Sequence, residues 1–465
     1  MHWNVNMNDI ENQKHVLKIN LSQMTNKISP PQFVMLVFLS LILIGTFLLA
    51  LPASSQSGLS IGLVDALFTA TSAVCVNGLV VLDTGSVFST FGQVVIMVLI
   101  QIGGLGFMTM GVIIAILLGK RIGLRQRLII QQTTQSKSSS GLVKLCLYIV
   151  CIAFAFELVA VTVLTLRWMG DMGFSDALYH AIFHSISAFN NAGFALWTDS
   201  LSEFVNDPIV NLTIMWLFVS GGLGYIVIVE LIRKRKWKIL SLHTKIVLVS
   251  SGCLLIVGFV LLFVLETLNP STFGQLTFFE RIWSGFFQSA TARSAGFNTI
   301  DISSMLSASQ LVLIILMFIG ASSGGTGGGI KTTTFFVLIL ATINTFRGGG
   351  QIHAFERKIS IDIIMRALAV VMSSILCVLI VALLLTVTEG IYEEHFMEVL
   401  FEATSAFSTA GLSMGLTSEL TDPGKAIVTV TMFIGRLGPL TLAYALAEKK
   451  RKSKLGYPED HVLIG

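Results

Sequence analysis

The sequence predicts an all-α integral membrane protein in which eight transmembrane helices form four similar repeats around a common axis. Three observations support this fold class: the composition, the number of long apolar stretches, and a glycine motif that occurs four times. Of the 465 residues, 54% are hydrophobic and only 12% are charged, whereas soluble domains carry about 25% charge. The net charge of +4 is small and does not indicate a nucleic-acid partner. We therefore expect the chain to lie in a lipid membrane.

Eight apolar stretches are each long enough to span a bilayer, which takes about 20 residues. They begin near Phe33, Val94, Val143, Pro208, Ile246, Leu311, Ile363 and Ile427. A shorter apolar piece separates the first stretch from the second, and the same holds for each later pair. Such a piece is too short to cross the membrane, so we expect it to form a re-entrant half-helix.

The predicted half-helices end in similar sequences. These read SAVCVNGL from Ser72, SAFNNAGF from Ser187, ATARSAGF from Ala290 and SAFSTAGL from Ser405. Their glycines recur at nearly regular intervals, and a second glycine motif follows each of them (IGGLGF, SGGLGY, IGASSG and IGRLGP). This internal repeat divides the chain into an N-terminal tail (1–30), repeat one (31–120), repeat two (140–235), repeat three with a broken second helix (245–347), repeat four (360–448) and a C-terminal tail (449–465).

Lysines and arginines indicate the orientation of the predicted spans. They gather in both tails and after every second span, for example in RKRKWK at 233–238 and KKRKSK at 449–454. Acidic residues such as Asp171, Glu203 and Glu394 fall on the opposite side. By the positive-inside rule, we expect a multi-pass protein of the cell membrane with both termini cytoplasmic. We expect no cleaved signal peptide, and the five scattered cysteines predict neither a disulfide framework nor a covalent cofactor.

The four glycine loops are predicted to meet around one cavity, because irregular backbone in a membrane must line a cavity or pack in protein. Four loops around one axis would present a ring of carbonyl dipoles able to replace the water shell of an ion. The negative end of each half-helix dipole would favour a cation. The alternative is that the glycines only let membrane helices pack closely. The predicted filter residues are Val76, Asn77, Gly78, Asn191, Ala192, Gly193, Ser294, Ala295, Gly296, Thr409, Ala410 and Gly411.

These motifs, with QIGGLGFMT at 101–109, GASSGGTGGGIKTT at 320–333 and IGRLGPLTL at 434–442, resemble the Trk/Ktr/HKT potassium-uptake superfamily over about residues 30–465. The resemblance is greatest to the membrane subunits of bacterial Ktr systems. It implies four helix–pore-loop–helix repeats around a pseudo-fourfold pore, commonly sodium-stimulated, with potassium bound at Gly78, Gly193, Gly296 and Gly411. It also implies a homodimer and a cytosolic nucleotide-binding regulatory ring of the KtrA/KtrC type, with ATP or ADP on that ring and not on this chain.

Selectivity is left open by one filter position. Glycine in all four loops favours potassium, since superfamily members with serine in the first loop tend to pass sodium. Asn77, however, stands where threonine is frequent. A sodium- or mixed-cation-conducting member therefore remains an alternative, as does an alternating-access cation symporter, although such transporters use inverted repeats. The spans contain neither HExxH nor paired carboxylates, so we do not predict an enzyme.

The stretch from Gly320 is predicted to interrupt the sixth span. It is not a phosphate-binding loop, because Ile330 separates Gly329 from Lys331. Each glycine disfavours a helix by about 1 kcal/mol relative to alanine, so we expect an intramembrane gate, with a static kink as the alternative. We expect Arg436 to donate to carbonyl or hydroxyl groups of this stretch, with pairing to Glu157 as the alternative. The predicted gate comprises Gly320, Ser322, Ser323, Gly324, Gly325, Thr326, Gly327, Gly328, Gly329, Lys331 and Arg436.

Overall fold

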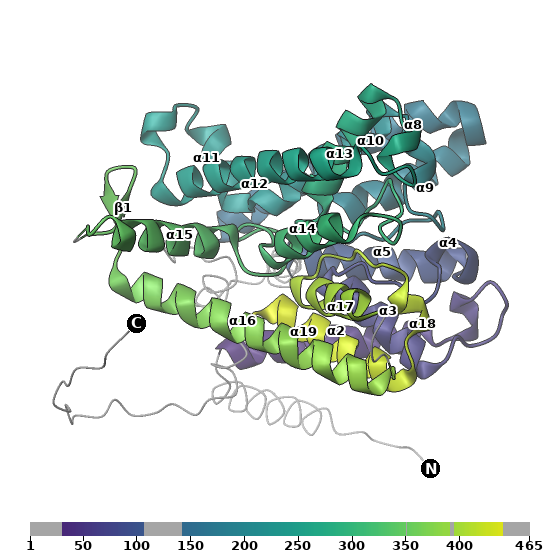
Figure 1. Cartoon of the computed structure of the whole chain (residues 1–465). Coiled ribbons are helices and arrows are strands. Elements are labelled where there is room, and N and C mark those ends of the chain that lie inside the picture. The colour runs from purple at the N-terminus through teal and green to yellow at the C-terminus, as the bar shows by residue number, and fades with distance from the viewer. Residues whose placement is uncertain (1–29, 107–141, 350, 391–394, 440–465) are drawn as a thin grey trace, which may run out of the picture.

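The computed structural model describes residues 30–106, 142–349, 351–390 and 395–439, and this part of the chain is mostly helical (Figure 1). The predicted tails, 1–30 and 449–465, lie outside the described residues except for Pro30, and so does most of the loop after the second predicted span.

In chain order, the helices can be divided into four groups. The first comprises α2 (Pro30–Leu49), η1 (Pro52–Ser54), α3 (Leu63–Cys75), α4 (Thr84–Val87) and α5 (Thr90–Leu105). The second comprises α8 (Leu142–Met172), α9 (Phe174–Phe189), η2 (Ser202–Phe204), α10 (Pro208–Leu223) and α11 (Tyr225–Arg233). The third comprises η3 (Trp237–Ile239), α12 (Leu242–Glu266), η4 (Phe273–Gln275), α13 (Phe278–Thr291), α14 (Ser307–Phe318) and α15 (Thr332–Phe346). The fourth comprises an antiparallel hairpin of β1 (His353–Ala354) and β2 (Arg357–Lys358), then α16 (Ile361–Thr388), α17 (Phe396–Ser408), α18 (Leu416–Glu419) and α19 (Asp422–Leu437).

Long apolar helices make this an all-α membrane protein. Among the described residues, α2, α8, α12 and α16 are long and apolar enough to cross a membrane, and the α10–α11 pair would make a fifth span. At 1.5 Å per residue, about 20 residues cover the hydrocarbon thickness. The other predicted spans correspond to the shorter helices α5, α14, α15 and α19. Of these, α5 and α19 end beside residues outside the described part.

The segments predicted to form half-helices are the helices α3, α9, α13 and α17, which are 13 to 16 residues long. Each carries an acidic residue in its first turn: Asp65, Asp176, Glu280 and Glu398. A negative charge there stabilises the positive end of the helix dipole. The opposite end of each helix is buried and leads directly into one of the predicted glycine loops.

Contacts between successive groups close a ring. The second helix of one group packs on the half-helix of the next: α5 contacts α9, α10 contacts α13, and α14 contacts α17. The last helix, α19, returns to contact α3, so the last group packs against the first (Figure 1). The four half-helices are thereby held inside, while the long helices carry many exposed large hydrophobic side chains, as lipid-facing surfaces do.

The span predicted from Pro208 is sharply bent, which the sequence analysis did not anticipate: α10 and α11 meet at an angle of 97°. The break lies at Gly224, whose φ of +96° is readily accessible only to glycine. The corresponding glycines after α5 and α19, Gly106 and Gly438, also have positive φ. The sequence predicted an interrupted second helix in the third group only, whereas helices end at this level in every group.

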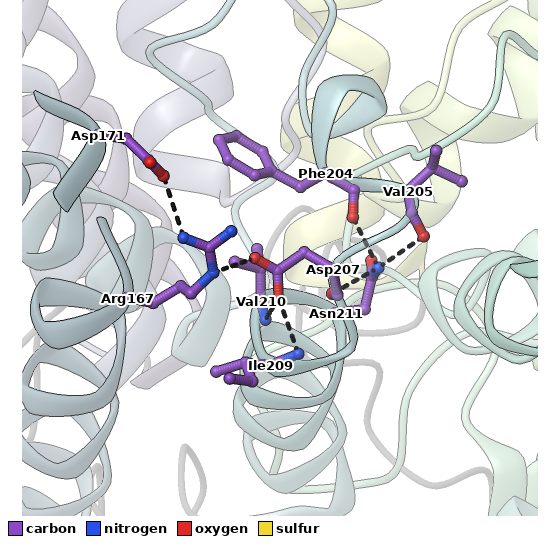
Figure 2. Close-up of polar contacts among 8 residues, drawn as sticks. All are labelled: Arg167, Asp171, Phe204, Val205, Asp207, Ile209, Val210 and Asn211. Atoms are coloured by element: carbon purple, nitrogen blue, oxygen red, sulfur yellow. Dashed lines mark hydrogen bonds and ion pairs between the residues drawn. The ribbon is translucent and has the colours of Figure 1, made fainter. Parts of the chain in front are cut away.

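An ion-pair cluster ties the end of α8 to the start of α10 (Figure 2). Arg167 pairs with Asp171 at 3.0 Å and with Asp207 at 2.5 Å. The other oxygen of Asp207 caps α10 by accepting from the backbone N–H of Ile209 at 2.9 Å. Asn211 then donates to three backbone carbonyls of the preceding turn, which fixes the approach to α10.

Candidate functional site

The four glycine loops share an unusual backbone conformation. The residue two before each glycine has a positive φ, which is rare for residues with a side chain. These residues are Val76 (56°), Asn191 (59°), Ser294 (71°) and Thr409 (47°). The glycines also have positive φ: Gly78 (92°), Gly193 (72°), Gly296 (79°) and Gly411 (79°). Strained backbone of this kind persists only where the surroundings enforce it and is concentrated at functional sites.

The four glycines converge on one another. A Cβ added to Gly78 would lie 3.2 Å from the Cα atoms of Gly193 and Gly411, and one added to Gly296 would lie 2.8 Å from the Cα of Gly193. One added to Gly411 would lie 3.0 Å from the Cα atoms of both Gly296 and Gly78. The glycines therefore form a closed ring in chain order, and any side chain on them would point into crowded space.

Carbonyl oxygens alternate with the glycines around this ring. A Cβ at Gly78 would lie 2.5 Å from the carbonyl oxygen of Ala192, which precedes the next glycine in the ring. The same relation, with the carbonyl of the residue before the next glycine, holds at the other positions. A Cβ added to Gly193 would lie 3.1 Å from the carbonyl oxygen of Ala295, and one added to Gly296 would lie 3.1 Å from that of Ala410. One added to Gly411 would overlap with the carbonyl oxygen of Asn77. The ring is thus lined by peptide groups and not by side chains.

Hydrogen bonds brace three of the loops from behind. The hydroxyls of Ser72, Ser187 and Thr291 donate to the carbonyl of the residue after each glycine, at 2.8, 2.8 and 2.6 Å. Each bond joins the half-helix to the far side of its own loop. The equivalent hydroxyl in the fourth loop, that of Ser405, makes no such bond. This bracing holds the loops in place against the mutual repulsion of carbonyl oxygens that face one another.

The side chain of Asn77 does not line the ring. It is fully buried, and its amide donates to the carbonyl of Ala406 on α17 at 3.0 Å. Its oxygen accepts from the N–H of Leu79 at 3.4 Å. Asn77 therefore joins the first loop to the fourth half-helix, and only its backbone carbonyl reaches the ring.

A polar cavity of about 210 Å³ opens on the side of the ring away from the half-helix ends. All four glycines line it, together with Asp83, Asn298 and other polar residues. Glu402 of α17 supports its wall from behind, because the buried carboxylate accepts from Thr417 at 2.5 Å and Ser413 at 2.9 Å. His184 of α9 plays a similar part by accepting from the N–H of Leu196 at 3.2 Å.

The opposite side of the ring is covered by the glycine segment, which we define as residues 320–331. The hydroxyl of Thr326 donates to the side-chain oxygen of Asn191 at 2.7 Å. A Cβ on Gly327 would lie 2.7 Å from that of Ser294, and one on Gly328 would overlap with Thr409. The segment therefore packs against Asn191, Ser294 and Thr409, which are three of the four positive-φ residues that lie two positions before the ring glycines.

One cationic side chain ties the glycine segment to its surroundings and another bonds within it. Arg436 of α19 donates to the carbonyl of Thr326 and, at 2.6 Å, to the carbonyl of Gly103 at the end of α5. Lys331 donates to the carbonyl of Gly327 at 2.7 Å. Glu157, the alternative partner for Arg436, instead accepts from Gln101 at 3.0 Å.

The bend between α10 and α11 supplies most of the remaining anchors. The N–H groups of Ser322 and Thr326 donate to the carbonyls of Gly222 and Gly221, at 3.0 and 3.2 Å. Gly325 also packs on these two carbonyls, and Gly324 accepts from the N–H of Tyr225 at 3.1 Å. The hydroxyls of Ser322 and Ser323 bond those of Thr332 and Thr333, at 3.0 and 3.1 Å. Gly320 and Gly329 pack on each other where the two ends of the segment meet.

The second glycine motif has a packing role that the sequence analysis missed. A Cβ on Gly103, Gly221 or Gly435 would overlap with the carbonyl oxygen of Val74, Phe189 or Phe407, near the end of the half-helix in the same group. Glycine therefore lets the second helix touch the carbonyl end of the half-helix. In the third group, Gly320 faces Gly328 instead, because the glycine segment occupies this level. The recurrence of the motif was the available signal.

A buried polar network was also missed. Gln101 of α5 links Glu157 of α8 to Asn190, which follows α9 and donates to Gln101 at 2.7 Å.

Arg293, beside the third loop, donates to the carbonyl of Ser251 at 3.2 Å and so braces that loop from behind. In the described part of the chain, no group of three or more His, Cys, Asp or Glu side chains is placed to hold a metal ion.

Buried helix ends that meet in a ring of peptide groups are typical of membrane transport proteins, and the relatives of this chain are ion transporters and not enzymes. The chain belongs to the TrkH family of cation transport proteins, whose family model matches residues 12–454. It is 44% identical to the Ktr system potassium uptake protein B of Bacillus subtilis, over 94% of this chain and 97% of that protein. It is 36% identical to the potassium/sodium uptake protein NtpJ of Enterococcus hirae, over 97% of this chain and the full length of that protein.

A solved structure has the same fold. The crystal structure of the potassium transporter TrkH from Vibrio parahaemolyticus matches with a TM-score of 0.71 at 18% identity, covering 89% of this chain and 84% of that one.

Proposed function

We propose that this chain is the ion-translocating subunit of a Ktr-type potassium uptake system in the cell membrane. In this proposal, eight spans form four pore repeats, and potassium crosses at the ring of Gly78, Gly193, Gly296 and Gly411. The observation that carries the proposal is the alternation of glycines and carbonyl oxygens around a closed ring. The names of the relatives from Bacillus subtilis and Enterococcus hirae support it, since both are potassium uptake proteins.

Carbonyl dipoles suit a cation that must lose its water shell. Backbone oxygens replace that shell, and the carbonyl ends of four buried half-helices add a negative potential at the ring. Glycine at each ring position keeps the oxygens of neighbouring loops close together. The buried side chain of Asn77 acts on the ring only through the backbone, which favours potassium over a mixed selectivity. The relative named for both potassium and sodium keeps the mixed-cation alternative in view.

The glycine segment is proposed to be the gate. It packs across one side of the ring, where Arg436 of α19 bonds to Thr326 and Lys331 bonds to Gly327 within the segment. Their charges also oppose a cation in the same space. Opening requires the segment to leave the bend at Gly224, which costs its hydrogen bonds to Gly221 and Gly222.

Partners and orientation complete the proposal. We propose a homodimer with both termini cytoplasmic, stimulated by sodium and regulated by a cytosolic ring that binds ATP or ADP. The basic residues at 233–238, at the end of α11 and before α12, lie on the side where the cytosolic regulatory partner would dock. Nucleotide binding is assigned to the partner and not to this chain.

Complementation of a potassium-uptake-deficient bacterium tests the proposal. The native chain should support growth at low potassium, and Gly296→Ser should not, because its side chain would enter the ring. Gly170→Ser is the matched control, since nothing lies within 4 Å of a Cβ at that position. Equal growth of the native chain and Gly296→Ser, at equal amounts in the membrane, would remove the assignment of the ring.

A further inference from the structure

Two apolar cavities flank α15, the helix that follows the glycine segment. The larger, of about 550 Å³, lies among α14, α15, α16 and α17, and the smaller, of about 420 Å³, lies among α12, α14 and α15. Four residues line both cavities: Ile315, Ile319, Phe335 and Ile339. The junction between α14 and α15 is therefore loosely packed on two sides.

The described residues that line the larger cavity offer no free polar group. Its polar lining residues are Thr342 and Thr404. Each hydroxyl donates to a carbonyl of its own helix, that of Leu338 at 2.9 Å and that of Leu400 at 2.8 Å. A buried water needs two to four polar partners, and a polar ligand would lose its hydration without compensation. The lining therefore selects a hydrocarbon.

The rim of the larger cavity is continuous with the lipid-facing surface of the protein. Ile343 and Phe346 on α15 are 41% and 86% exposed, and Leu379 on α16 is 54% exposed. All three line the cavity, and α16 is one of the membrane-spanning helices. Acyl chains of the bilayer are the hydrocarbon present at this opening, so they are the occupant that the position favours.

We propose that the larger cavity binds an acyl chain of a membrane lipid, and that this chain holds the glycine segment in its described conformation. The cavity touches both ends of the segment, since Ile319 directly precedes Gly320 and Ile330 directly follows Gly329. A chain in the cavity completes the van der Waals contacts of both ends. The smaller cavity, on the other side of α15, gives that helix room to move when the chain leaves. The regulatory role rests on the proposed function, whereas the binding site does not.

Photolabelling tests the site without any ion flux. The full chain is reconstituted in liposomes containing phosphatidylcholine with a diazirine in one acyl chain, and labelled residues are mapped by mass spectrometry. We expect labelling of Ile339, Ile343 and Leu379 to exceed that of Leu158 on α8, which is 68% exposed outside the cavity. An excess of about tenfold would correspond to a preference of about 1.4 kcal/mol. Equal labelling at all four positions would overturn the site.

Variants that fill the cavity provide the matched comparison. Thr342→Trp, or Ile343→Trp if the first variant does not fold, should abolish the excess labelling. Leu376→Trp is the control, because Leu376 lies on the exposed face of α16 and does not line either cavity. Labelling that persists in the filled variants would overturn the site. So would a chain-to-chain crosslink through Thr342→Cys in a cysteine-free background, which would identify a second copy as the occupant.

Flux measurements test the regulatory role separately. Potassium flux through the native chain should change between liposomes of saturated and unsaturated lipids, and flux through Thr342→Trp should not. If labelling is in excess but potassium flux through the native chain is the same in saturated and unsaturated lipids, the regulatory role is overturned and the binding site is retained. Loss of flux in every sample, with the labelling excess intact, would count against the proposed function and support the site.

Discussion

Replacing Gly78 by alanine should block the proposed pathway. The new Cβ would lie 2.5 Å from the carbonyl oxygen of Ala192 and 3.2 Å from the Cα atoms of Gly193 and Gly411. An oxygen so close must move, and it belongs to the set that we propose to bind the ion. Alanine at a φ of 92° adds left-handed strain of about 1–2 kcal/mol. This strain should lower Tm, whereas displacement of the oxygen should weaken ion binding; each 1.4 kcal/mol lost from ion binding would lower flux by about tenfold.

The assay is potassium flux into proteoliposomes, normalised to folded protein. Gly173→Ala separates backbone strain from obstruction, because Gly173 has a φ of 82° and nothing within 4 Å of an added Cβ. Both variants should lower Tm, and only Gly78→Ala should lower flux. Native flux in Gly78→Ala, or an equal loss in Gly173→Ala, would refute the reasoning. Gly411→Ala and Gly193→Ala should resemble Gly78→Ala, because a Cβ on Gly411 would overlap with the carbonyl oxygen of Asn77 and one on Gly193 would lie 2.8 Å from the Cα of Gly296.

Three further predictions concern the parts around the ring. Arg436→Gln removes charge-assisted hydrogen bonds to the carbonyls of Thr326 and Gly103, and each is worth about 1.5–3 kcal/mol. The glycine segment should therefore open more often. Potassium flux, measured in single channels or in liposomes, should rise about tenfold or more. Deleting residues 322–328 should also raise flux, and an unchanged or reduced flux in folded protein would count against a gate. Glu402→Gln weakens the hydrogen-bond acceptor for the hydroxyls of Thr417 and Ser413. The preference for potassium over sodium should therefore fall in a competition assay. Glu398→Gln, in the first turn of α17, should leave this preference unchanged.

The half-helices and glycine loops could be predicted from the sequence because both leave local signals. Membrane composition forces irregular backbone into a shared interior, and Gly78, Gly193, Gly296 and Gly411 recur at similar spacing. Interruption of the sixth span was predictable because glycines accumulate there. The donors on Arg436 were expected to find carbonyls, since a charge inside a membrane needs a partner.

Other features depend on tertiary contacts that one sequence does not encode visibly. The orientation of Asn77 toward Ala406 requires knowing that the fourth half-helix lies behind the first loop. The bend at Gly224 arises because the glycine segment supplies partners for the freed backbone, and the segment lies about a hundred residues further along the chain. The apolar cavities beside α15 reflect how four helices diverge, which hydropathy alone cannot indicate.

A high-resolution structure of the full chain with rubidium in place of potassium tests the central claim most directly. Rubidium scatters anomalously, so its position can be identified. The account predicts anomalous density at the centre of the ring, bounded by the carbonyl groups of Asn77, Ala192, Ala295 and Ala410. Rubidium bound only elsewhere along the protein, with the ring closed to it, would contradict the account.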